Sequence, residues 1–179
     1  INKQPSGGKH PCYVAVDKTG HWVFAGNYSS GSIGLLHANK DGSLDTLKQI
    51  VQHEGSGANK QRQEGPHVHS TIVSEDNKFL YVPDLGIDKV MTYSFDKTKG
   101  TLKYKSAAAS LPGNGPRHFE FAPNNKFAYL MEEMTGTVVC YKAGNGNLQF
   151  VQRISALPAG FKGAIGSADI HVSPDGKFL

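Results

Sequence analysis

Residues 117–148 read RHFEFAPNNKFAYLMEEMTGTVVCYKAGNGNL, and this stretch contains every feature of a unit that the rest of the chain repeats. It opens with alternating apolar residues and passes through the turn PNNK into an aromatic residue, Phe127. A run of β-branched residues begins at Val138, and a Gly-x-Leu step at 146–148 introduces a last apolar stretch. Alternation between short turns of Gly, Asn and Pro predicts four antiparallel strands and no helix.

The same features recur at matching spacings along the chain. The aromatic residue after each turn, here called the anchor, occurs at Trp22, Phe79, Phe127 and Phe178. The Gly-x-Leu step occurs at 42–44, 100–102 and 146–148. The expected first strands of the units are 11–17, 67–74, 117–122 and 168–173. A four-stranded unit that repeats about every fifty residues is typical of a β-propeller blade.

We therefore predict an all-β fold, a partial β-propeller of four-stranded antiparallel blades that occupies residues 1–179. The expected blades are approximately 10–52, 67–109 and 117–155, with the start of a fourth at 168–179. Propellers typically close with about four to eight blades, so we interpret the chain as an incomplete fragment of about three and a half blades. Its open blade edges could support self-association. A β-sandwich also has short strands, but it gives no reason for repeated anchors.

Composition excludes several classes of protein. The formal net charge is +4, and lysines lie singly in turns such as those at 17–18 and 125–126, which predicts a solvated surface and no nucleic-acid partner. No stretch approaches the roughly 18 apolar residues of a membrane span, so we expect no membrane partner. The sequence leaves the compartment open, and we favour a cytoplasmic location.

One position of the repeat differs in chemistry from unit to unit. Ten residues before the anchors stand Cys12, His69, Arg117 and Ala168. The first strand of a propeller blade lines the central channel, so these side chains are expected around one mouth of it. Antiparallel pairing sets the end of each second strand beside the start of the first. Counting across the turns places Glu133 roughly opposite Arg117, and it places Tyr28 opposite Cys12 and Leu85 opposite His69.

A histidine, an arginine and a glutamate would thus converge at one channel mouth and could form a functional site. Equally, Arg117 and Glu133 could form a cross-strand ion pair worth about 0.2–1 kcal/mol, and His69 could be a buried structural histidine. The residues alone leave both interpretations open. His67 lies two residues from His69, but no third ligand is close in sequence, so we predict no metal and no cofactor.

Five segments are specific when taken together. They are HPCYVAVD at 10–17, RQEGPHVHS at 62–70, VPDLG at 82–86, GPRH at 115–118 and HVSPDGKFL at 171–179. They resemble the propeller-type lactonases, a family that contains 6-phosphogluconolactonases and a carboxymuconate cyclase. The resemblance runs through the whole chain and implies a seven-bladed propeller of about twice this length that acts on a lactone without a metal.

The resemblance also implies roles for individual residues. It places the family's active-site histidine on His69, its first arginine on Arg117 and its glutamate on Glu133. Glu132 is the residue that a one-position error in register would choose instead. The family's second arginine would follow Leu179. The Gly-Pro turns at 65–66 and 115–116 lead into the segments that hold two more histidines, His67 and His118, and we expect these to bind substrate.

The expected function is hydrolysis of a small-molecule sugar lactone, most simply in the manner of a 6-phosphogluconolactonase. Arg117 and a protonated or donor-form His69 would stabilise the developing oxyanion, and Glu133 would orient or deprotonate the water. A lactone-forming cyclase would use the same site differently. A non-enzymatic propeller that holds a binding partner at its channel mouth or rim is the alternative from another class.

Overall fold

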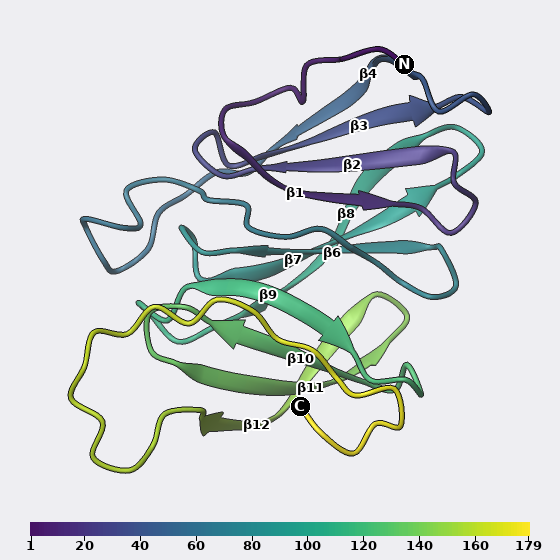
Figure 1. Ribbon diagram of the computed structural model, residues 1–179. Coiled ribbons are helices and arrows are strands. Elements are labelled where there is room, and N and C mark those ends of the chain that lie inside the picture. Colours follow the sequence, from purple (N-terminus) through teal and green to yellow (C-terminus); the bar gives the residue numbers. More distant parts are fainter.

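The computed structural model describes residues 1–179 and consists of strands, turns and loops without a helix. Each of three antiparallel sheets is built from four consecutive strands (Figure 1). The strands are β1 (Pro11–Val16), β2 (Trp22–Asn27), β3 (Ser32–Ala38) and β4 (Leu44–Gln52); β5 (Ile72–Val73), β6 (Phe79–Asp84), β7 (Lys89–Asp96) and β8 (Thr101–Ala109); β9 (Pro116–Phe121), β10 (Phe127–Glu132), β11 (Thr137–Gly144) and β12 (Asn147–Ser155). This arrangement confirms the predicted all-β fold of four-stranded propeller blades. The structure has no helix of the length and hydropathy needed to cross a membrane.

The repeat is visible in the backbone of the turns that precede the anchors. In every unit a backbone N–H donates to the carbonyl oxygen of the anchor five residues later, at 2.8–2.9 Å. The four pairs are Asp17–Trp22, Ser74–Phe79, Ala122–Phe127 and Ser173–Phe178. The turn of the fourth unit therefore has the same geometry as the three that join complete strands.

Two of the expected first strands differ from the structure. Residues 168–173 do not form a strand, because no backbone ladder pairs this segment with a neighbour. The expected strand 67–74 is reduced to β5, preceded by a single bridge between Val68 and Asp84, because an extra residue interrupts the pairing with β6. Both expectations were wrong because strand pairing is lost in these segments. The alternation of apolar residues does not reveal where pairing is lost.

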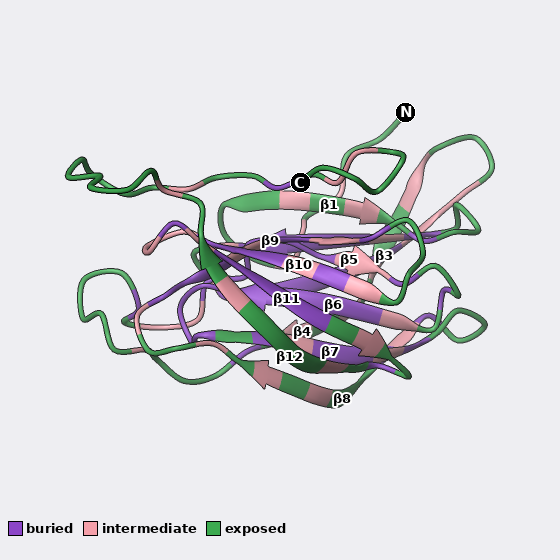
Figure 2. Ribbon diagram, turned by 90° about the horizontal axis from the view of Figure 1, so that it is seen from below, coloured by how far each residue is buried: buried purple, intermediate pink, exposed green.

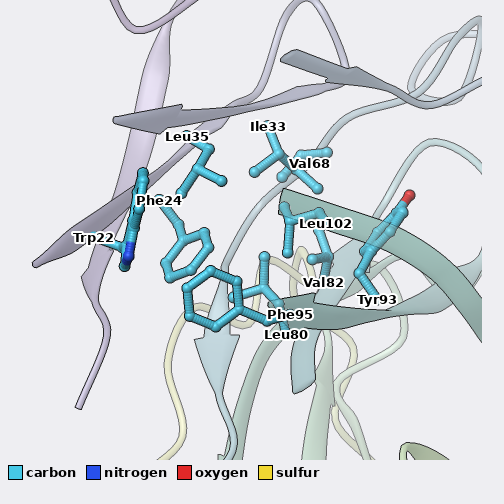
Figure 3. Close-up of a cluster of buried hydrophobic side chains, with 10 residues drawn as sticks. All are labelled: Trp22, Phe24, Ile33, Leu35, Val68, Leu80, Val82, Tyr93, Phe95 and Leu102. Carbon is cyan, nitrogen blue, oxygen red and sulfur yellow. The ribbon is translucent and has the colours of Figure 1, made fainter. Parts of the chain in front are cut away.

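Hydrophobic side chains fill the space between the first two sheets. Phe24 and Leu35 from the first sheet are fully buried, and they face Leu80 and Phe95 of the second (Figure 3). The rings of Phe24 and Phe95 meet edge to face with centroids 5.1 Å apart. Burying such side chains contributes about 1.5–3 kcal/mol each, so this layer fixes the first two blades against each other.

The middle sheet is buried on both faces, and strand alternation explains how. Leu80 and Val82 point to the first sheet, whereas Tyr81 between them packs on the other side with Phe119 and Leu130 of the third sheet. Figure 2 shows the resulting pattern, with buried residues concentrated in the middle strands of the sheets and exposed residues on the edge strands β1, β8 and β12. Successive blades therefore share hydrophobic layers, as propeller blades do.

The glycine of the Gly-x-Leu step packs against the anchor of the preceding blade. A Cβ atom added to Gly100 would lie 1.9 Å from the ring of Trp22, and one added to Gly146 would lie 2.6 Å from the ring of Phe79. Both glycines also have positive φ, +61° and +75°. The anchor and the glycine recur together in the sequence because they meet across each blade interface.

Candidate active site

The first strands are irregular where the repeat position of variable chemistry lies. In β1 a shift of register leaves Cys12 without a partner on β2, and in β9 a shift leaves Arg117 without a partner on β10. Between Val68 and Ile72 the register against β6 also slips by one residue, next to His69. A β-bulge turns a side chain away from its regular direction, so three blades redirect a side chain at equivalent places.

The backbone pairs differ from those expected from counting by one residue in the register of each hairpin and by one more at each bulge. The N–H of Glu133 donates to the carbonyl oxygen of Gly115 at 2.8 Å, so Glu133 does not pair with Arg117 in the backbone. The two other pairs are likewise shifted by two residues, to Tyr28–His10 and Leu85–His67. The side chains of Arg117 and Glu133 nevertheless meet, because the bulge carries Arg117 toward the end of β10.

The carboxylate of Glu133 lies between two guanidinium groups. Arg117 Nε donates to Glu133 Oε2 at 2.9 Å, and Arg62 Nη2 donates to Glu133 Oε1 at 2.5 Å. His69 Nε2 lies 3.7 Å from the same Oε2. The Glu133 side chain keeps 14% of its surface exposed. A carboxylate held in this way is oriented and still open to a small molecule.

His69 is uncharged at neutral pH. Burial, with a smaller contribution from the positive charge of Arg117, lowers the pKa of His69 to about 4. The ring of Tyr28 meets the imidazole edge to face at 5.3 Å, and Cys12 Sγ lies 4.0 Å from its Nδ1. A proton on Nε2 faces the Glu133 carboxylate. Of the two forms considered, the neutral donor is the one that this environment favours.

Glu132 belongs to a different part of the molecule. It is fully buried and accepts hydrogen bonds from Asn114 Nδ2 at 2.6 Å and from Arg153 Nε and Nη2 at 2.9 and 3.0 Å. The hydroxyls of Ser110 and Thr137 donate to it as well. These hydrogen bonds lower the pKa of Glu132 although burial alone would raise it. Glu132 ties the third blade to the loop that precedes it, and Glu133 is the carboxylate that faces the cavity.

The two additional histidines lie at the edges of the cluster. The ring of His67 stacks on Tyr28 at 4.5 Å, and His67 Nε2 is 3.4 Å from Glu64 Oε1. His118 meets the ring of His69 edge to face at 5.5 Å, while its Nδ1 is 2.6 Å from Asp169 Oδ1. His118 also lines a second cavity of about 550 Å³, which lies along the first strands of the three sheets, β1, β5 and β9.

An open cavity of about 740 Å³ lies over the cluster. It is lined by His10, Pro11, Cys12, Tyr28, Ser29, Arg62, His69 and Glu133. No three His, Cys, Asp or Glu side chains are grouped in a geometry suited to a metal ion. The chemistry available at this cavity is therefore that of a carboxylate, two arginines and a neutral histidine, and a reaction without a metal or cofactor stays a prediction.

Arg62 is the residue that the sequence reasoning missed. It lies in the loop between β4 and β5, which has no counterpart at a fixed offset in the other units. The repeat register, which selected the other members of the cluster, therefore gave no signal for it. Tyr28 and Cys12 did fall in register with Glu133 and Arg117, so a signal for these two was present.

The fold and this cluster can be compared with known proteins. A family model described as "Lactonase, 7-bladed beta-propeller" matches residues 1–179. The chain belongs to this lactonase family. The predicted resemblance is thereby confirmed over the whole chain, and the three sheets correspond to blades of a seven-bladed propeller.

Relatives within the family carry lactonase names. The chain is 35% identical to the 6-phosphogluconolactonases of Formosa agariphila and Bacillus subtilis, and the match covers 100% of this chain and 51% of each relative. The structure of the periplasmic gluconolactonase PpgL of Pseudomonas aeruginosa aligns with a TM-score of 0.91 at 35% identity, covering 97% of this chain and 50% of that one. The chain thus spans about half the length of these relatives.

Proposed function

We propose that the intact natural protein hydrolyses a sugar lactone, of which 6-phosphogluconolactone is the first candidate. The observation that carries this proposal is the Glu133 carboxylate, which lies between Arg117 and Arg62 and beside a neutral histidine at an open cavity. The names of two relatives, both 6-phosphogluconolactonases, support the substrate class.

In the proposed reaction water adds to the lactone carbonyl and the ring C–O bond then breaks. Glu133 orients the water and accepts its proton as the oxygen attacks the carbonyl carbon. Arg117 and the Nε2–H of His69 donate to the carbonyl oxygen as it becomes negative. The proton held by Glu133 then passes to the ring oxygen as it leaves, which gives the open-chain acid. This transfer returns Glu133 to its starting carboxylate form, and the acid then departs.

The charge state of His69 supports hydrolysis over the lactone-forming direction. A cyclase of the carboxymuconate kind needs an acid that delivers a proton to a carbon–carbon double bond. With its pKa lowered to about 4, His69 carries no extra proton to give at neutral pH. As a neutral hydrogen-bond donor it is nevertheless suited to an oxyanion.

The remaining roles extend this proposal. His67 and His118 would hold polar groups of the substrate from the two sides of His69, which they flank through Tyr28 and by direct ring contact.

A cytoplasmic location stays a prediction that cell fractionation can test, with the periplasm as the alternative. Self-association through open blade edges also stays a prediction, and light scattering of the 179-residue chain would test it.

The direct test is hydrolysis of fresh 6-phosphogluconolactone by the intact natural protein, followed against the spontaneous rate. The 179-residue chain, which holds half of the length of its relatives, is assayed beside it. We expect the intact protein to exceed the spontaneous rate clearly. A rate equal to the spontaneous one, with this and other sugar lactones, would refute the proposal and favour a binding propeller.

A further inference from the structure

The loop that carries Arg62 is held in place from both ends. Gln63 is buried, and its side chain donates to the carbonyl oxygen of Leu85 at 2.8 Å and accepts from the N–H of Asn59 at 2.8 Å. The side chain of Asn59 in turn accepts from the N–H groups of Gln61 and Arg62 at 3.0 and 3.2 Å. The backbone of Arg62 is therefore positioned by specific contacts.

The Arg62 guanidinium is only partly used by the protein. Its hydrogen bonds run from Nη2 alone, to Glu133 Oε1 at 2.5 Å and to the Tyr28 hydroxyl at 3.5 Å. The side chain is 46% exposed, and it borders the cavity over His69. Nε and Nη1 make no hydrogen bond to the protein. The Nε–H and Nη1–H groups are thus free to donate to an anion at the cavity.

Arg117 is occupied more fully. Its Nε binds Glu133, its Nη1 donates to the carbonyl oxygen of Ala168, and its side chain is 21% exposed. With two cationic arginines, one anionic Glu133 and a neutral His69, the cluster carries one net positive charge. The unbalanced charge lies toward the open side, where Arg62 is the more exposed of the two arginines.

We propose that Arg62 binds the anionic substituent of the lactone, a phosphate or carboxylate, and so determines the preference for anionic over neutral sugar lactones. The inference rests on the proposed function. The free Nη1–H or Nε–H groups of the guanidinium would donate hydrogen bonds to the oxygens of the anion while Nη2 stays on Glu133, so Arg62 links substrate binding to the carboxylate that handles the water. Lactones without the anion would bind without this contact.

A purely positioning role for Arg62 makes a different prediction. If Arg62 served only to orient Glu133, its loss would slow the hydrolysis of charged and neutral lactones by the same factor. If it binds the anion, the loss is selective and appears mainly in KM. The two roles are therefore separated by measuring one enzyme variant on two substrates.

The experiment compares 6-phosphogluconolactone with glucono-1,5-lactone in the intact protein carrying Arg62→Ala. We expect kcat/KM to fall about 10- to 100-fold for the phosphorylated lactone and at most about 3-fold for the neutral one. Arg62→Lys should keep part of the preference because it keeps the charge. Lys60→Ala, in the same loop and without a side-chain contact, is the matched control and should change neither rate.

Inhibition by the product gives a second measurement that does not depend on turnover of the variant. Inhibition by 6-phosphogluconate should weaken by a similar factor in Arg62→Ala, whereas inhibition by gluconate should stay the same. Equal losses of kcat/KM for both lactones, or equal changes in inhibition by 6-phosphogluconate and gluconate, would overturn the inference while leaving the proposed function in place. If the wild-type protein hydrolyses neither lactone above the spontaneous rate, the proposed function itself fails.

Discussion

Glu132 and Glu133 are neighbours at the end of β10, yet their surroundings differ completely. Glu132 is fully buried and receives hydrogen bonds from four side chains of the third blade and of the loop that precedes it. Glu133 meets only cationic or neutral partners at the edge of an open cavity. Consecutive residues of a strand point to opposite sides, so one step along the chain separates a carboxylate that supports the fold from one that faces the cavity.

The other blades show which of the two positions is structural. The residues in register with Glu132 are Asn27 and Asp84, and both are fully buried. Asp84 accepts hydrogen bonds from the backbone N–H groups of His67 and Gly86 and lies 2.6 Å from His53 Nδ1. The residues in register with Glu133 are Tyr28 and Leu85, which share no chemistry with it. The position of Glu132 holds a buried polar residue in every blade and therefore supports the fold. The position of Glu133 differs from blade to blade and is therefore the one available for function.

The largest effect is expected on the structural side. Replacing Glu132→Ala leaves Arg153 and three further donors without their acceptor, which should lower the free energy of unfolding by about 3–5 kcal/mol. Denaturant unfolding of the intact protein measures this loss. Glu54→Ala removes an exposed carboxylate without contacts and is the control. A loss no larger than that of the control would contradict the structural role.

On the chemical side, Arg117→Ala should reduce activity and largely spare the fold. Removing one donor to a developing oxyanion typically costs about 10²–10³ in rate, and we expect kcat to fall by that factor. Steady-state kinetics with 6-phosphogluconolactone measure it, and thermal unfolding checks the fold. The exposed turn residue Lys126 gives the control, Lys126→Ala. An unchanged kcat would remove Arg117 from the proposed site.

A smaller loss of stability is expected from a substitution at the interface between two blades. Gly100→Ala places a methyl group against the ring of Trp22 at positive φ and should cost about 1–3 kcal/mol of stability. Gly42 occupies the same register position, also with positive φ, but has no atom within 4 Å. Gly42→Ala should therefore cost only the backbone strain, about 1 kcal/mol. Equal losses in denaturant unfolding would show that the contact with Trp22 is unimportant.

The smallest effect concerns the neutral histidine beside Glu133. Because folding depresses the pKa of His69 from its usual 6.5 to about 4, the unfolded chain binds a proton that the folded protein does not between these values. The neutral His69 therefore contributes stability above pH 6.5 that is lost as the pH falls toward 4. The difference in unfolding free energy between wild type and His69→Gln should shrink over that range. A difference that is independent of pH would contradict the depressed pKa.

Much of this architecture could be predicted from the sequence because a repeat makes positions comparable. The anchors, the turns and the Gly-x-Leu steps all have counterparts, and their offsets predicted the sheets before any contact was known. The convergence of His69, Arg117 and Glu133 followed from the same register.

What could not be predicted are the features that break the repeat. A one-residue bulge at Cys12 or Arg117 leaves no mark on the alternation of apolar residues, yet it shifts every backbone pair beyond it. The segment 168–173 has the composition of a strand but no ladder. Arg62 comes from a loop with no counterpart in the other units, and only the folded chain brings it to Glu133.

The comparison of the two glutamates is tested most directly by one crossed experiment. Glu133→Gln and Glu132→Gln are each made in the intact protein, and both hydrolysis of 6-phosphogluconolactone per folded molecule and thermal stability are measured. We predict that Glu133→Gln loses at least about 100-fold in kcat with little change in stability, and that Glu132→Gln is destabilised while its folded fraction stays active. Full activity in Glu133→Gln, or loss of activity in folded Glu132→Gln alone, would contradict the assignment.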